Sequence, residues 1–411
     1  MYLTHLSLTN YRSFARLDLD VPRRLVMLVG DNAQGKTSLL EAVYFLASFT
    51  SFLASSDSQL INFDAVVEPL AVARLVADYR RLNKSHHLEV RLVQSAGDAS
   101  GCTRFHKEIL LDGVKKNAAE VIGHFNAVIF LPQMLRIIEE GQEDRRRYLN
   151  LALSQAQPGY AQQLSEYSQA LTQRNALLKL LAERGGDQDQ LIFWDQVLVK
   201  YGAPLIKARI TALQELDRLA RGIHHRLTHA HEVLRIVYQP AFDPLPQPVK
   251  QYALPIDTPV YRSKANLEDI QEGFARKLAE LRSVEIARGV TTTGPHRDEL
   301  RFISNGIDLG DFGSRGQART ALLAVKLAEV AWMKQRTGDW PVVLLDEILA
   351  ELDTQRRADL LETLSECEQG ILTTTDLNLF TPSFLQAAEC WTVQGGSVKM
   401  SDEGLGMKKE W

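Results

Sequence analysis

The spacing of apolar and polar residues predicts a chain that begins with strands, continues with long helices and returns to strands. In the first part, apolar residues alternate with polar ones as in half-buried strands, and one unbroken apolar run is typical of a fully buried strand. Asp112-Gly113 is typical of a hairpin turn, so an antiparallel β arm is expected around it. The strand candidates are residues 2–8, 17–21, 25–29, 70–79, 87–93 and 105–111.

After about residue 119 the apolar residues recur three or four positions apart, which is the period of amphipathic helices. Gly185-Gly186 interrupts this pattern once, so two long helices joined by a tight turn are expected. The expected helices are residues 164–181, 191–223 and 267–281. A proline-rich irregular connection is expected at residues 240–255, and strand-like sequence returns near residue 300.

The composition indicates a soluble globular protein. Of 411 residues, 45% are hydrophobic and 24% are charged, which suits two or three domains with a sizeable core. Three widely separated cysteines predict neither disulfides nor a metal site and favour the reducing cytosol. No secretory leader is visible, and no apolar run approaches the ~20 residues of a membrane span. We therefore expect a cytoplasmic protein that does not bind a membrane.

Residues 30–37, G-D-N-A-Q-G-K-T, match the phosphate-binding loop G-x-x-x-x-G-K-[ST]. A strand is predicted before this loop and a helix after it, which is the context that the motif requires. The glycines let consecutive N–H groups point at one phosphate, and the helix N-terminus adds its positive end. Lys36 is expected to reach the outer phosphates, and the Thr37 hydroxyl to hold Mg²⁺.

A second half of the site is expected near residues 340–347, W-P-V-V-L-L-D-E. In phosphate-loop proteins, an acid at the end of such an apolar strand holds Mg²⁺, which assigns that role to Asp346. The neighbouring Glu347 is placed to activate water as a general base. Alone, the pattern favours an ordinary acid after a strand. Its pairing with the phosphate loop favours the functional interpretation.

Residues 312–317, F-G-S-R-G-Q, precede a strong helical pattern. Serine and glycine before a helix form a second anion-binding N-terminus, which is suited to a γ-phosphate. Taken by themselves, the same residues favour a simple helix cap and turn, and both interpretations stay open at this point.

Several motifs together resemble the ATPase heads of the ABC type, and within them the RecF family of bacterial recombination mediators. The motifs are spread over nearly the whole chain. Their occurrence in this order is more specific than a phosphate loop alone. SMC-type relatives carry long coiled coils between the two half-sites, whereas this insertion is short. The motifs are N-Y-R-S-F (10–14), the phosphate loop, D-R-R-R-Y-L (144–149), G-P-H-R-D (294–298), S-R-G-Q (314–317), L-L-D-E (344–347), E-L-D (351–353) and T-T-T (373–375).

The resemblance implies an α/β fold, namely an ABC-type P-loop ATPase head with an antiparallel β arm and a mainly helical inserted second domain. The head is expected from residues 1–118 and 288–411, and the helical insertion from residues 119–287. The C-terminal half of the head would carry the signature, the Walker B strand and the D-loop.

The resemblance also implies ATP and Mg²⁺ as cofactors. Glu347 and Lys36 would be catalytic, and Thr37, Asp346 and Gln133 would lie at the metal. Thr375 or a neighbour would replace the switch histidine of transporter-type heads. The residues implied in ATP binding are Arg12, Gly30, Asp31, Asn32, Ala33, Gln34, Gly35, Lys36, Thr37 and Ser38, with Ser314, Gly316, Gln317 and Asp353 acting on the ATP of the opposite subunit.

The family's function then implies an ATP-dependent DNA-binding protein of recombinational repair, replication restart and the SOS response to DNA damage. It would bind gapped or duplex DNA and single-/double-strand junctions without sequence preference, as an ATP-induced homodimer. Slow, Mg²⁺-dependent, DNA-stimulated ATP hydrolysis would drive release, and other recombination mediator proteins would be partners in recombinase loading.

A net charge of −4 restricts DNA contacts to local basic clusters. Each cluster is equally expected to be a solvated face or a set of internal ion pairs. Any DNA binding is expected to be directed at the backbone. The clusters are Arg80-Arg81 with Lys84, Lys107 with Lys115-Lys116, and Arg145-Arg146-Arg147.

Two positions and one segment depart from the family pattern. Ala318 stands where a second signature glutamine is common, and Gln133 stands where an acid is common. Residues 51–63 lack the basic residues that relatives often carry. None of these changes removes a residue that hydrolysis needs.

Two other function classes remain open. A nucleotide-gated interaction protein with negligible hydrolysis would differ from the ATPase in showing no effect of Glu347→Gln on turnover. A P-loop phosphotransferase with a helical lid would leave the S-R-G-Q and E-L-D motifs unexplained.

Overall fold

The computed structural model describes residues 1–66, 70–95, 104–245 and 262–400, which form two compact units. The first comprises the described residues of Met1–Met134 and Glu329–Trp411, and the second those of Leu135–Ala328. The first unit is therefore assembled from both ends of the sequence, with the second unit inserted between them.

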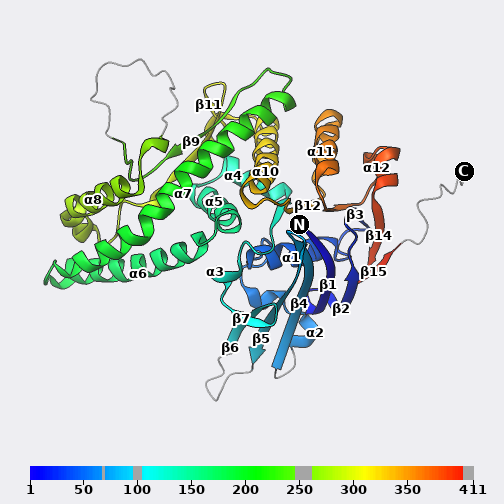
Figure 1. The fold of residues 1–411 in the computed structure, drawn as a ribbon, viewed down its shortest axis with the longest axis horizontal. Helices are drawn as coiled ribbons and strands as arrows, with labels where there is room; N and C mark the ends of the chain where they lie inside the picture. Colours follow the sequence, from blue (N-terminus) through cyan, green and yellow to red (C-terminus); the bar gives the residue numbers. More distant parts are fainter. Residues whose placement is uncertain (67–69, 96–103, 246–261, 401–411) are drawn as a thin grey trace, which may run out of the picture. The chain divides into compact units, whose positions relative to one another are not determined.

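The first unit contains a mainly parallel sheet with the strand order β15-β14-β3-β13-β12-β8. Figure 1 labels β3, β12, β14 and β15 among these strands. Only β15 pairs antiparallel. The apolar runs of β3, β12 and β13 are almost completely buried, as expected of strands covered on both faces. The carboxyl ends of these parallel strands lie at one edge of the sheet. The strands are β3 (Leu25–Val29), β8 (Ala127–Phe130), β12 (Val342–Asp346), β13 (Gly370–Thr374), β14 (Glu389–Gln394) and β15 (Ser397–Met400).

The predicted antiparallel arm is a second sheet of the first unit, with the order β2-β1-β4-β5-β6-β7. Asp112-Gly113 forms the turn between β6 and β7, as predicted. Helix α1 (Lys36–Ser48) shares one continuous apolar core with both sheets, because nearly every side chain after its first turn is buried. The arm strands are β1 (Tyr2–Tyr11), β2 (Phe14–Asp20), β4 (Leu70–Arg81), β5 (Lys84–Ser95), β6 (Arg104–Leu111) and β7 (Val114–Lys116).

Shorter elements complete the first unit. The segment after α1 holds a 3-10 turn and α2, and two helices lie between the C-terminal strands. These elements are η1 (Asp57–Leu60), α2 (Phe63–Val66), α3 (Ala118–Val121), η2 (Pro132–Leu135), η5 (Ile348–Glu351), α11 (Thr354–Glu366), η6 (Leu377–Leu379) and α12 (Pro382–Ala387).

The second unit is mainly helical and contains the predicted pair of long helices, which run side by side in Figure 1. A small sheet with the order β11-β10-β9 accompanies them. The elements are α4 (Arg136–Glu139), α5 (Gln142–Ala156), α6 (Tyr160–Arg184), α7 (Gln190–Leu227), β9 (Leu234–Gln239), η3 (Arg262–Lys264), α8 (Leu267–Arg288), η4 (Pro295–Arg297), β10 (Glu299–Ser304), β11 (Ile307–Asp308), α9 (Leu309–Phe312) and α10 (Arg315–Thr337), whose last turns belong to the first unit. Most of the predicted proline-rich connection, residues 246–255, lies outside the described residues.

The limits of the two units differ from the boundaries predicted after residues 118 and 287. Strand β8 belongs to the first unit because it pairs with β12. Strand β10 belongs to the second unit because it pairs with β9, a strand that the helical interpretation of this region left out. Both differences come from pairing between strands that are distant in sequence.

The G-P-H-R-D motif forms a polar hub in the core of the second unit. A Cβ on Gly294 would lie 2.5 Å from the Tyr167 hydroxyl, so only glycine fits there. The Asp298 carboxylate accepts hydrogen bonds from Arg209 at 2.6 Å, from the Tyr238 hydroxyl at 2.5 Å and from the Ala241 N–H at 3.0 Å. Residues 294–298 therefore join α6, α7 and the chain after β9.

His296 of this motif is half-buried between two neutral partners. Its Nε2 lies 3.2 Å from the Thr291 carbonyl oxygen, which can only accept, so Nε2 carries the proton. Nδ1 then accepts from the Tyr167 hydroxyl at 2.7 Å. Burial lowers the pKa of His296 from 6.5 to about 4, and the neighbouring Arg297 and Arg146 charges add to this effect.

This lowered pKa predicts a loss of stability in mild acid. Between pH 6.5 and 4 the unfolded chain binds a proton at His296 and the folded chain does not, so stability falls as the pH falls. The free energy of unfolding should decrease by about 2 kcal/mol between pH 7 and pH 5 through this residue. Denaturant unfolding of the protein and of His296→Gln at both pH values measures the difference. An unchanged pH dependence in the variant contradicts the assignment.

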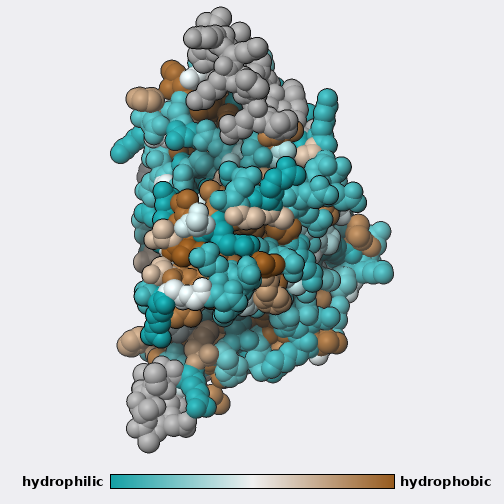
Figure 2. All heavy atoms as spheres, turned by 90° about the vertical axis from the view of Figure 1, so that its left-hand side faces the viewer, coloured by the Kyte–Doolittle hydropathy of each residue, from teal (hydrophilic) through white to brown (hydrophobic). Residues whose placement is uncertain are grey.

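Figure 2 shows a face on which hydrophilic residues predominate and hydrophobic ones lie scattered among them. Among the described residues, no helix combines the length and the apolar character needed to cross a membrane.

Candidate nucleotide-binding site

The predicted phosphate loop connects β3 to α1. Gly35 has φ of 108°, a conformation that side chains rarely adopt, and a Cβ there would lie 3.0 Å from the Ser13 Oγ. A Cβ on Gly30 would lie 2.4 Å from the Val393 carbonyl oxygen. Both glycines are therefore required by close packing of the loop against the ends of neighbouring strands.

The loop is held from outside by the turn between β14 and β15. The Gly395 N–H donates to the Gln34 side-chain oxygen at 2.8 Å, and the Gly396 N–H donates to the Gln34 carbonyl at 3.3 Å. Gln34 therefore has a structural contact that the motif alone did not predict.

Lys36 is folded back over the loop. Its ammonium group donates to the carbonyl oxygens of Gly30 at 2.7 Å and Asp31 at 2.9 Å, and lies 3.4 Å from the Glu347 carboxylate. The side chain is only 4% exposed. A buried cation on a phosphate loop is placed to exchange these contacts for phosphate oxygens.

Asp346 ends β12, and hydroxyl groups surround its carboxylate. Thr37 donates to both carboxylate oxygens at 3.0 and 3.1 Å, and Thr373 at the end of β13 donates to Oδ1 at 2.8 Å. Burial raises the pKa of Asp346; the two threonine hydrogen bonds oppose that rise, while the charge of Glu347 adds to it. A cation beside this carboxylate would relieve the cost of its burial.

Glu347 follows Asp346 in the left-handed region, with φ of 49°, which is strained for a residue with a side chain. Its N–H donates to the Thr373 hydroxyl at 3.0 Å, and its side chain is 41% exposed. The bend turns Glu347 toward an open pocket of about 260 Å³ at the phosphate loop. The pocket is lined by Ser13, Asn32, Ala33, Gly35, Lys36, Thr37, Ser38 and Glu347.

These residues fit a magnesium–nucleotide complex. Mg²⁺ prefers oxygen ligands and is usually held by one or two protein groups together with substrate phosphates. Thr37 and Asp346 supply such a pair, since their oxygens already lie 3.0 Å apart. In the part of the chain that is described, no group of three or more His, Cys, Asp or Glu residues is arranged to hold a metal alone. A site completed by phosphate oxygens is consistent with that finding.

Arg12 and Gln133 are two of the predicted residues that lie outside the pocket lining. The Arg12 guanidinium makes two hydrogen bonds of 2.8 Å with the buried carboxylate of Glu41 on α1. Arg12 therefore braces α1 in this structure, and its predicted contact with ATP remains a prediction. Gln133 is exposed in η2, after β8, and its role at the metal also stays a prediction.

The signature residues lie in the second unit, at the start of α10. The Gln317 N–H donates to the Ser314 hydroxyl at 3.2 Å, and the Ser314 N–H donates to the Gln317 side-chain oxygen at 3.1 Å, which is a capping box. Ser314 and Gly316 are exposed. In the first unit, the Asp353 side chain caps α11 by accepting from the Arg356 N–H at 2.9 Å and is 51% exposed. Action of these residues across a subunit interface remains a prediction.

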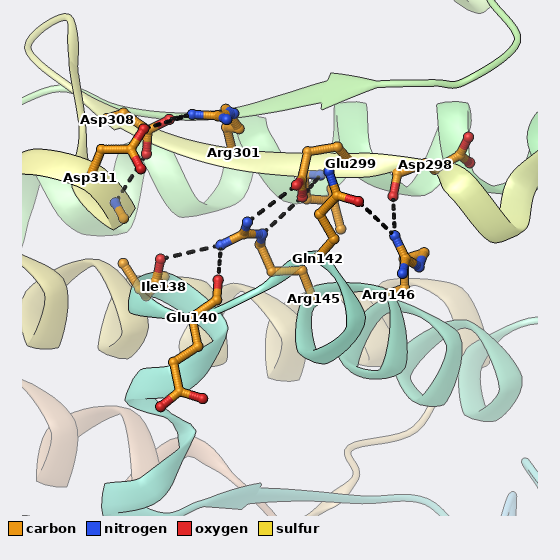
Figure 3. Close-up of polar contacts among 12 residues, drawn as sticks. Ile138, Glu140, Gln142, Arg145, Arg146, Asp298, Glu299, Arg301, Asp308 and Asp311 are labelled. Atoms are coloured by element: carbon orange, nitrogen blue, oxygen red, sulfur yellow. Dashed lines mark hydrogen bonds and ion pairs between the residues drawn. The ribbon is translucent and has the colours of Figure 1, made fainter. Parts of the chain in front are cut away.

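The basic clusters are partly internal. The Arg145 guanidinium bonds to Glu299 at 2.9 and 3.2 Å and also donates to the carbonyl oxygens of Ile138 and Glu140, as Figure 3 shows (Figure 3). Lys107 bonds to Asp57 at 2.7 Å, and Arg81 donates to the carbonyl oxygens of Gly123 and His124. For these three residues, the internal ion-pair or hydrogen-bond interpretation is the one that applies.

Comparisons with known proteins agree with this geometry. The family model of the RecF/RecN/SMC N-terminal domain matches residues 2–393. The DNA replication and repair protein RecF of Roseiflexus castenholzii is 38% identical over 97% of this chain and 99% of its own length. RecF of Chloroflexus aurantiacus is also 38% identical, with the same coverage. The chain belongs to the RecF family.

A solved structure described as the recombination mediator protein RecF with ATPrS in the RecFOR pathway has a TM-score of 0.80 and 30% identity to this RecF-family chain. The match covers 97% of this chain and 98% of the chain in that structure. A structure described as RecF with ATP has a TM-score of 0.79 and 29% identity. The predicted fold class, an ABC-type α/β ATPase head with an antiparallel arm and a mainly helical insertion, is confirmed.

Three residues of this RecF-family site were missed by sequence reasoning. Thr373 joins Asp346 to Glu347, Ser13 lines the pocket, and Glu41 anchors Arg12. The T-T-T and N-Y-R-S-F motifs contain the first two, but they were interpreted through Thr375 and Arg12 instead. No local pattern marks Glu41, which is a charged residue on an otherwise apolar helix face.

Proposed function

We propose that this protein is an ATP-dependent DNA-binding protein of recombinational repair and replication restart. It binds gapped or duplex DNA without sequence preference and hydrolyses ATP slowly in a Mg²⁺-dependent, DNA-stimulated reaction. Its partners in recombinase loading are other mediator proteins. Family membership supports this class of function. The observation that carries it is the contact of Thr37 with Asp346, with Lys36 and Glu347 directed to the same pocket.

In this proposal the loop residues Gly30 to Ser38 hold the triphosphate, and Lys36 leaves its carbonyl partners for the outer phosphates. Thr37 and Asp346, together with Gln133 as the sequence predicts, would hold Mg²⁺, which would supply the neutralisation of phosphate charge. Glu347 accepts a proton from the attacking water. The short distance from Lys36 to Glu347, 3.4 Å, supports a shared reaction centre.

ATP also acts as the link of a homodimer. Ser314, Gly316 and Gln317 of one copy contact the γ-phosphate bound by the other, and Asp353 lies at the same interface. The exposed N-terminus of α10 supports this role because helix N-termini bind anions. A ligand that contacts both copies stabilises only the assembled state.

Sedimentation or light scattering tests the homodimer directly. With Mg²⁺ and ATP, Glu347→Gln is expected to double in mass, and without nucleotide it should remain a monomer. Lys36→Ala is the matched variant that should stay monomeric under both conditions, because it lacks the phosphate contact. A constant mass of Glu347→Gln at saturating Mg-ATP contradicts the homodimer.

A nucleotide-gated interaction protein with negligible hydrolysis is the second candidate. The capping box agrees with this candidate, because it accounts for Ser314 and Gln317 as the start of α10 without a contact that promotes hydrolysis. ATP turnover of the unmodified protein decides between the two candidates.

A further inference from the structure

Arg297 differs from every other residue of the G-P-H-R-D motif. Gly294, Pro295 and Asp298 are buried, and His296 is half-buried between its two partners. Arg297 is exposed, and within the described part of the chain no hydrogen bond or ion pair engages its side chain. A strongly charged side chain thus extends from one of the most constrained segments of the second unit.

The backbone on both sides of Arg297 is fixed by buried contacts. The Arg297 N–H donates to the Gly294 carbonyl oxygen at 2.9 Å. The Pro295 carbonyl oxygen accepts a hydrogen bond from buried Arg209. Asp298, which follows Arg297, accepts hydrogen bonds from Arg209, the Tyr238 hydroxyl and the Ala241 N–H. A cation on such a rigid base loses little backbone freedom when it binds an anion.

A second arginine, Arg146, contacts the backbone of Asp298, the residue that follows Arg297. The Arg146 guanidinium, on α5, donates to the Asp298 backbone carbonyl at 3.1 Å and to Gln142 at 3.4 Å (Figure 3). Both contacts are with neutral groups, and no carboxylate is paired with Arg146 among the described residues. The charges of Arg297 and Arg146 both lower the pKa of His296, while the charge of Asp298 raises it, so both arginines lie within electrostatic reach of that ring.

The geometry points to a phosphate-binding site made by Arg297 and Arg146, which takes a backbone phosphate of DNA. Two guanidinium groups offer the forked donors that suit phosphate oxygens, and backbone contacts of this kind carry no sequence preference. This inference rests on the proposed function, since it names the site in the second unit through which DNA is held. Arg145 does not belong to the site because Glu299 pairs with it.

The salt dependence of DNA affinity tests the site. The logarithm of the binding constant falls with the logarithm of salt concentration by about 0.9 for each phosphate that is neutralised. With a gapped duplex and Mg-ATP, Arg297→Gln is expected to reduce this slope by about 0.9 and to weaken binding about tenfold. Arg297→Lys should keep the slope. The reduction should be equal for two gapped duplexes of unrelated sequence.

Arg276→Gln is the matched control. Arg276 is an exposed arginine on α8 of the same unit, so its substitution changes the net charge equally.

The mass change with Mg-ATP should be unaltered in Arg297→Gln, which shows that the variant folds and binds nucleotide. Equal slopes for Arg297→Gln and Arg276→Gln overturn the site while leaving the proposed function intact. A loss of ATP affinity or of dimer formation in Arg297→Gln also overturns it, because the arginine would then serve the nucleotide or the second copy. If the unmodified protein binds no DNA, both the proposed function and the site are wrong.

Discussion

Replacing Glu347 with glutamine is expected to lower the rate of ATP hydrolysis by about 10²- to 10⁴-fold, the usual contribution of a general base. The amide cannot accept the proton of the attacking water, whereas the pocket keeps its shape. ATP affinity should therefore change little. Turnover measured with excess ATP, together with equilibrium binding of a fluorescent ATP analogue, separates the two effects.

The control for this experiment is Glu362→Gln on α11, which makes the same change in charge at an exposed position away from the pocket. Its turnover should equal that of the unmodified protein. If Glu347→Gln hydrolyses ATP within a few-fold of the normal rate, another group activates the water. If neither protein hydrolyses ATP, the nucleotide-gated interaction protein is the better description.

Replacing Arg209 with methionine should lower the free energy of unfolding by about 3–5 kcal/mol, because the substitution leaves a buried carboxylate without its counter-charge. Arg209 is 1% exposed and donates to Asp298 at 2.6 Å, to Asn150 at 2.9 Å and to the Tyr160 hydroxyl at 3.2 Å. Interactions with nearby Tyr160, Asp298 and Tyr238 raise the pKa of Arg209 above its ordinary value, against the opposing effect of burial.

Denaturant unfolding measures this loss, with Arg276→Met as an exposed control that should change stability by less than about 0.5 kcal/mol. The double variant Arg209→Met with Asp298→Asn should lose less than the sum of the single variants, because the two residues share one network. A loss below 1 kcal/mol for Arg209→Met contradicts this prediction, because the hub would then tolerate an unpaired carboxylate.

Local sequence patterns were sufficient to locate the parts of the candidate site that are continuous in sequence. The loop between β3 and α1 has its glycines, Lys36 and Thr37 within eight consecutive residues, so its spacing specifies its conformation. Asp346 and Glu347 end a short apolar run, and the phosphate loop elsewhere in the chain supplied the functional interpretation of this common pattern. The pairing of α6 with α7 followed from apolar periodicity and the double glycine between them.

The remaining contacts depend on strand pairing, which sequence periodicity does not encode. Thr373 reaches Asp346 because β13 lies beside β12, and Gln34 meets Gly395 because β14 lies beside β3. Strand β8 is a run of only four residues, and β9 follows a 38-residue helix, so neither stood out against the helical pattern around it. The predicted limits of the two units differ from the observed ones for the same reason.

The neighbours of β3 on both sides, β13 and β14, come from the far end of the chain. During synthesis on the ribosome, the phosphate loop emerges early but lacks both flanking strands until the inserted unit has been made. At about 5–20 residues per second this delay is on the order of tens of seconds. The nascent first unit must therefore remain open through that interval, and we expect chaperones to meet it there, while the inserted unit is free to fold first.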